Sequence, residues 1–193
     1  MGQVFDGEGR VHPVTWLEAG PNVVTQIRTK DKDGYESVQV GFGSRPEKNT
    51  PKPEQGHLKD LPSLRYIREF RTTASELKRG DTITVTIFEE GSRVDVSGTT
   101  KGKGFQGVVK RHGFGGGSRT HGQKHSEREP GSIGGGGRAG GRVAKGMSMA
   151  GRMGGVRVTT QNLKVVKILA DKNLIALEGA VPGHRGSLIE IYA

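Results

Sequence analysis

The 193-residue chain contains no cysteine, which excludes disulfide bonds and thiolate metal sites and favours a reducing compartment. Aromatic residues make up only 5% of it. No apolar run approaches the roughly 18 residues that a membrane-spanning helix needs. The first residues, from Met1 to Asp6, lack the basic flank and apolar stretch of a secretory signal. We therefore expect a soluble, cytoplasmic protein with no membrane partner.

Acidic side chains are nearly missing from residues 98–157, which we call the extension. It has two acids against twelve lysines and arginines, so its net charge of +10 equals that of the whole chain. It also holds 20 of the 33 glycines and only thirteen apolar residues. Glycine loses more backbone entropy on ordering than any other residue, and so few apolar side chains cannot offset that loss. The sequence predicts that a negatively charged partner orders the extension.

Outside the extension, short segments rich in β-branched and aromatic residues alternate with turn signals, which predicts a mainly β protein. We expect a small closed or nearly closed β-barrel, with an open sandwich as the alternative. Residues 45–64 contain four prolines and predict an inserted surface lobe with a short helix over 53–59. The barrel body then comprises residues 1–44, 65–97 and 158–193. Its expected strands cover residues 11–18, 23–29, 35–42, 65–71, 81–88, 163–170, 174–178 and 186–192.

Three patterns in the extension resemble catalytic or ligand sites, and each lacks its structural context. Residues 102–107 fit the letters G-x-G-x-x-G, but the glycines that follow His112 allow no helix to continue, as a dinucleotide site requires. His121 and His125 have the spacing of a metal pair only on a helix, and Arg119 and Lys124 would repel a cation. No serine has a nucleophile-elbow context. We expect no cofactor, no metal, no small-molecule substrate and no enzymatic activity.

RNA fits the extension better than these alternatives or a merely solubilising role. Glycines between the charges let the backbone approach phosphates, and arginine both pairs with phosphate and stacks on bases. Phe105, Phe114 and a methionine group provide apolar anchors. The residues predicted to bind RNA are Lys101, Lys103, Phe105, Lys110, Arg111, His112, Arg119, His121, Lys124, His125, Arg128, Arg138, Arg142, Lys145, Arg152 and Arg157.

Longer stretches resemble a known family. Residues 94–107 (VDVSGTTKGKGFQG), 128–134 (REPGSIG), 149–154 (MAGRMG) and 179–183 (GAVPG) occur in the order found in the universal large-subunit ribosomal protein three family, bacterial type. The resemblance implies a translation-factor-like β-barrel with an inserted lobe and a long Gly/Arg/Lys-rich extension. It also implies that the extension threads into large-subunit rRNA toward the peptidyl transferase centre without supplying catalytic groups. Neighbouring large-subunit proteins and a role in early subunit assembly complete the expectation.

The chain departs from the family in two places. Members usually begin with a strand ahead of the methionine that matches Met1, so we expect either that this chain is a shortened form of the protein or that its first strand is reduced. Many bacterial members carry a glutamine that is methylated where Arg152 stands, and arginine cannot take that modification. The resemblance places residues 145–157 at the tip of the extension, deepest in the RNA, with Met147, Met149 and Met153 packing there.

Two other functions stay open on the sequence. A free RNA-binding chaperone with a disordered extension would bind RNA without needing a defined fold. A nucleotide-binding enzyme with a translation-factor-like barrel is the less favoured alternative, because the chain has no G-x-x-x-x-G-K-[ST] phosphate loop.

Overall fold

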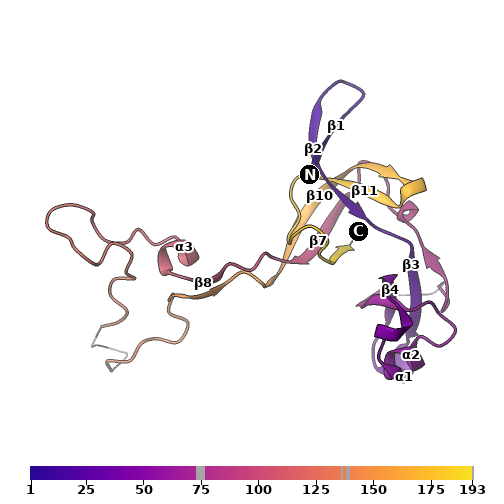
Figure 1. The fold of residues 1–193 in the computed structure, drawn as a ribbon, viewed down its shortest axis with the longest axis horizontal. Helices are drawn as coiled ribbons and strands as arrows, with labels where there is room; N and C mark the ends of the chain where they lie inside the picture. Colours follow the sequence, from indigo (N-terminus) through magenta and orange to yellow (C-terminus); the bar gives the residue numbers. More distant parts are fainter. Residues whose placement is uncertain (73–76, 136, 138–139, 193) are drawn as a thin grey trace. The chain divides into compact units, whose positions relative to one another are not determined.

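The computed structural model describes the chain except residues 73–76, 136, 138–139 and 193 (Figure 1). The chain forms two compact units. The first comprises Met1–Asp95, Gln161–Ala180 and Tyr192–Ala193, and the second comprises Val96–Thr160 and Val181–Ile191. In the part of the chain that the structure describes, no helix has the length and apolar character to cross a membrane. The predicted division into a body, an inserted lobe and the extension stays a prediction.

The larger sheet has six strands in the order β1-β2-β11-β10-β7-β12. Their bounds are β1 Gly2–Phe5, β2 Val11–Glu18, β7 Arg93–Thr99, β10 Arg157–Leu169, β11 Leu174–Glu178 and β12 Ile189–Tyr192. β2 lies between β1 and β11 and is antiparallel to both. β10 and β11 form an antiparallel hairpin, joined by the 3₁₀ turn η3 (Ala170–Lys172). Asn173 closes that turn with φ of 51°, a conformation that asparagine tolerates.

Both faces of this sheet are covered around β11. Val165, Ile175 and Leu177 share one face and are fully buried, and Val14 and Ala176 on the opposite face are fully buried as well. β1 lies close to β2 because Gly2 has no side chain: a Cβ there would be 3.2 Å from Nε1 of Trp16. β1 is not among the predicted strands, although residues 1–44 were assigned to the β body.

The smaller sheet has four strands in the order β5-β4-β3-β6. β3 (Asn22–Arg28), β4 (Ser37–Ser44) and β5 (Leu64–Phe70) match the predicted strands within two residues. Val24, Val38 and Leu64 are buried. At Gly41 an added Cβ would lie 2.2 Å from Leu64 Cδ1, so the glycine makes room for this packing. β3 and β4 are connected by the one-turn helix α1 (Lys30–Asp33), which ends at Gly34 with φ of 80°.

The strand predicted over residues 81–88 is wrong. β6 covers only Thr82–Ile83, and the chain then forms the 3₁₀ turn η2 (Val85–Ile87). Val85 is fully buried, whereas Ile87 is 61% exposed. A 3₁₀ turn has three residues per turn, so residues two apart point in different directions. The apolar alternation that suggested a strand therefore does not place these side chains on one face.

Residues 45–64 contain the 3₁₀ turn η1 (Glu47–Asn49) and the helix α2 (Lys52–His57), close to the helix predicted over 53–59. Leu58 and Thr50 are buried, and the Oγ atoms of Thr50 and Ser63 are 2.7 Å apart. These contacts give the segment a small local core.

The second unit contains a two-stranded antiparallel ribbon of β8 (Gly104–Gln106) and β9 (Gly151–Met153). The one-turn helix α3 (Val108–His112) follows β8, and the described residues between α3 and β9 form no further helix or strand. The sequence analysis specified none of these three elements. Because most of the regular structure in the described residues is antiparallel strand and the helices are short, the protein is mainly β, as predicted.

Candidate nucleic-acid interface

Backbone hydrogen bonds hold the outgoing and returning halves of the extension together near its root. Thr100 N–H donates to the carbonyl of Val156 (2.9 Å), Gly155 N–H to Thr100 (3.1 Å) and Lys103 N–H to Met153 (2.9 Å). Gly154 has φ of 71°, and a Cβ there would lie 2.1 Å from the carbonyl oxygen of Lys101. Only glycine permits so close an approach.

The helix α3 packs on the returning chain. Val108 is 2% exposed, and Arg111 Nη1 donates to the carbonyl oxygen of Met149 at 2.6 Å. Nε2 of His112 lies 3.0 Å from the same oxygen. A Cβ on Gly151 would be 2.6 Å from Arg111 Nη1. The absence of a side chain at Gly151 therefore makes room for the guanidinium against β9. Arg111 and His112, both predicted to bind RNA, therefore also fix α3 to the returning chain.

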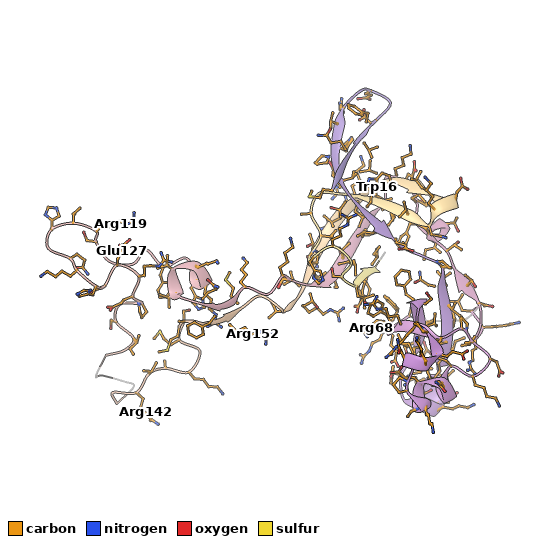
Figure 2. All side chains as sticks on the ribbon, in the orientation of Figure 1. Trp16, Arg68, Arg119, Glu127, Arg142 and Arg152 are labelled. Atoms are coloured by element: carbon orange, nitrogen blue, oxygen red, sulfur yellow. The ribbon has the colours of Figure 1, made fainter. Side chains whose placement is uncertain are left out.

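A loop over residues 117–127 is closed at its base. Gly117 N–H donates to the carbonyl of Glu127 (3.0 Å), and Arg119 Nε lies 2.7 Å from Glu127 Oε1. Figure 2 shows the two side chains of this ion pair together on the loop. A Cβ on Gly116 would be 2.0 Å from the Glu127 carbonyl oxygen, which explains the glycine there. The loop exposes His121, Lys124 and His125 to solvent.

Most of the predicted RNA-binding residues are accessible. Arg138 lies outside the described residues, and Arg111 is half-buried. The remaining ones are exposed, namely Lys101, Lys103, Phe105, Lys110, His112, Arg119, His121, Lys124, His125, Arg128, Arg142, Lys145, Arg152 and Arg157. The structure brings Phe105 opposite Arg152 in the ribbon.

Residues 145–157 do not form the tip of the extension. Gly151–Met153 is β9, paired with β8, and Arg157 begins β10. Arg157 also pairs with Glu190 at 2.5 Å. The chain between α3 and β9, which includes Arg119 and Arg142, makes the connection beyond the ribbon (Figure 2). The tip was an expectation from the family resemblance, and the β8–β9 pairing, which joins residues almost fifty apart in sequence, places residues 151–153 in the ribbon instead.

The second unit contains two further exposed residues, a histidine and an arginine, that are not among the predicted RNA-binding residues. His184 and Arg185 are exposed in the segment Val181–Ile191. This segment lies against the root of the extension, since a Cβ on Gly183 would be 3.1 Å from the carbonyl oxygen of Thr99. Only the fold joins it to the extension, because it lies more than twenty residues further along the chain.

The histidines of the extension lie on irregular chain or at the end of α3. His121 has φ of 58°, so His121 and His125 do not occupy successive turns of a helix. Among the described residues, no group of three or more His, Cys, Asp or Glu side chains could hold a metal ion.

A mainly β body that continues into an exposed, basic, glycine-rich segment is typical of structural nucleic-acid-binding proteins.

Comparison with known proteins gives the particular family. Residues 67–174 match the family model described as ribosomal protein L3. The chain is 54% identical over 193 residues to "Large ribosomal subunit protein uL3" of Herpetosiphon aurantiacus, covering 99% of this chain and 91% of the relative. It is 53% identical over 192 residues to proteins of the same name from Streptomyces coelicolor and Streptomyces avermitilis, in each case covering 98% of this chain and 89% of the relative. The chain belongs to the ribosomal protein L3 family, whose members are structural proteins and not enzymes.

Proposed function

We propose that this chain is a structural constituent of the large ribosomal subunit in the cytoplasm, bound to rRNA through its extension. The observation that carries the proposal is the concentration of exposed cations between residues 98 and 157, where only two acids occur. One of these acids, Glu127, is paired with Arg119, so little negative charge opposes an approaching phosphate. The names of the relatives support the same subunit.

The finer parts of the proposal rest on the same features. The six-stranded sheet and its buried valines would form the translation-factor-like barrel, with residues 45–64 as its inserted lobe. The extension would reach toward the peptidyl transferase centre and support early assembly, since a segment with so few buried apolar side chains gains most from RNA. Neighbouring large-subunit proteins would contact the body.

Phosphate contacts make a strong prediction about salt. A protein that neutralises about six to ten phosphates loses roughly a thousandfold or more in affinity between about 50 and 200 mM salt, because bound counterions are released. We expect this loss for the purified chain on large-subunit rRNA, measured by filter binding. An affinity that is flat with salt would remove the electrostatic basis of the proposal.

A second measurement separates a subunit constituent from a free RNA chaperone. A tagged copy expressed in bacterial cells should co-sediment with large subunits through a high-salt gradient, because a segment threaded into folded rRNA dissociates slowly. Release into the light fractions, with unchanged affinity for unstructured RNA, would favour the chaperone.

A further inference from the structure

The β8–β9 ribbon has two unlike faces. Opposed residues of an antiparallel pair place their side chains on the same side, so Phe105 and Arg152 share one face. On the other face the Arg111 guanidinium lies where a Gly151 side chain would be, and Met153 is half-buried. One face of the ribbon is therefore covered by the protein's own α3, and the other is bare.

Phe105 is exposed to an unusual degree. Its side chain is 76% exposed, the largest value among the large apolar residues of the extension that the structure describes. Removing a phenylalanine side chain from water is worth about 1.5–3 kcal/mol, so an occupant that covers this ring gains free energy. Added Cβ atoms on Gly102 and Gly107, which flank β8 on either side, would meet nothing within 4 Å. The backbone around the ring therefore leaves room for such an occupant.

Arg152 is available beside it. Among the described residues, no hydrogen bond or ion pair engages its guanidinium, whereas Arg119 and Arg157 each have a carboxylate partner. Cβ atoms of directly opposed residues are about 4.5–5.5 Å apart, so the ring and the guanidinium can contact one nucleotide together.

The charge around the ribbon identifies the occupant. Residues 100–107 and 150–157 contain no acid, and Arg157 is paired with Glu190, so Lys101, Lys103 and Arg152 leave a net positive charge that favours a negatively charged occupant. An aromatic ring offers a stacking surface to a base, and bases inside a duplex already have both faces stacked. We propose that Phe105 and Arg152 form a stacking site for one unpaired RNA base and its phosphate. This inference rests on the proposed function and assigns these two residues a role that differs from that of the other cations.

Substitution of the ring tests the stacking. Phe105→Leu keeps an apolar side chain but removes the aromatic face, and Phe5→Leu is the matched control because Phe5 is 65% exposed on β1. The probes are a single-stranded oligoadenylate and a blunt RNA duplex of the same length, titrated with the full chain. Phe105→Leu should weaken oligoadenylate binding about fivefold or more and leave duplex binding nearly unchanged. Phe5→Leu should change neither.

The salt dependence separates the two residues. Arg152→Gln should lower the slope of log affinity against log salt on the single strand by about 0.7, the value of one phosphate contact. Phe105→Leu should leave the slope as it is, because no charge is lost. Arg93→Gln, at an exposed position of β7, is the control for the loss of one arginine.

Tryptophan fluorescence at position 105 reports stacking directly, without a measurement of affinity. Phe105→Trp in a Trp16→Phe background places the single tryptophan on the ribbon, and its fluorescence should be quenched by oligoadenylate and not by the duplex. Circular dichroism checks that each variant is folded.

Three results would overturn the stacking site while rRNA binding persists. They are an unchanged oligoadenylate affinity in Phe105→Leu, an equal loss on single strand and duplex, or unchanged RNA affinity with impaired incorporation into large subunits. The last would mean that a protein covers the ring. If the wild-type chain binds no RNA in a salt-dependent way, the proposed function fails instead.

Discussion

Val14, Val165 and Leu177 are fully excluded from solvent in the first unit, whereas Val108 is the buried large apolar side chain among the described residues 98–157. The extension has instead a series of backbone hydrogen bonds and glycines that allow close approach, at Gly116, Gly151 and Gly154. Burial of apolar area stabilises a folded chain without a bound partner, whereas a backbone hydrogen bond adds little net free energy because it replaces hydrogen bonds to water. The first unit therefore has a core of buried apolar side chains, whereas the described residues of the extension are held mainly by backbone hydrogen bonds.

The largest expected effect comes from removing one region entirely. Deleting residues 103–154 and joining the ends with a short glycine linker removes β8, α3 and β9 together. RNA affinity should fall about a thousandfold or more because most of the phosphate contacts are lost. The thermal transition of the body, followed by circular dichroism, should stay nearly intact. Unfolding of the truncated chain would show that the extension belongs to the core.

Truncation of a buried side chain in the body should lower its stability and leave RNA binding unchanged. Leu177 is fully buried on β11, so Leu177→Ala should lower the free energy of unfolding by about 2–5 kcal/mol, measured by urea denaturation. RNA affinity at a temperature where the variant is folded should be unchanged. Ile87→Ala is the control, because Ile87 is 61% exposed and its truncation creates no cavity. A large loss of RNA affinity in folded Leu177→Ala would break the distinction between the regions.

Neighbouring glycines at the root of the extension sharpen the comparison. Gly154 and Gly155 both have positive φ (71° and 66°), so alanine at either costs roughly 1–2 kcal/mol of local strain. Only at position 154 does the added Cβ meet backbone, at 2.1 Å from the Lys101 oxygen. Gly154→Ala should therefore weaken rRNA binding more than Gly155→Ala, with the thermal transition of the body unchanged in both. Equal effects would mean that the close approach does not matter.

A small change in the stability of the body with pH is expected from His12. The ring of His12 lies 3.1 Å from Glu178 Oε1 and 3.2 Å from Asp6 Oδ2. Hydrogen bonds to Glu178 and then Asp6 raise the pKa of His12 above its ordinary value. A raised pKa means that the stabilisation is fully present below the unfolded-state pKa and is lost as pH rises through the folded-state pKa.

The matching experiment is a pH series of urea denaturation. Replacing His12 with Asn should destabilise the body more near pH 5 than near pH 8, because the protonated ring interacts with the two carboxylates. The same destabilisation at both pH values would show that protonation of His12 makes no contribution. The same substitution should leave the affinity for RNA unchanged at either pH, since His12 lies outside the extension.

Much of the body follows from local sequence patterns. The expected strands at 11–18, 23–29, 65–71 and 174–178 lie within two residues of β2, β3, β5 and β11, because alternation of apolar and polar residues reports which side chains face the core. Asn173 closes the β10–β11 turn in the left-handed conformation that asparagine tolerates. The same rule failed at residues 81–88, where the chain enters a 3₁₀ turn and only Val85 reaches the core.

Composition alone separates a neutral, β-rich body from a basic segment too rich in glycine to bury a core of its own. Those properties are sums over residues and need no knowledge of pairing. The order of the strands, the bonds that Arg111 and Arg119 make within the extension and the position of Phe105 opposite Arg152 follow only from the folded chain. Such pairings join residues distant in the chain, and the free energy that selects them depends on contacts that local periodicity does not record.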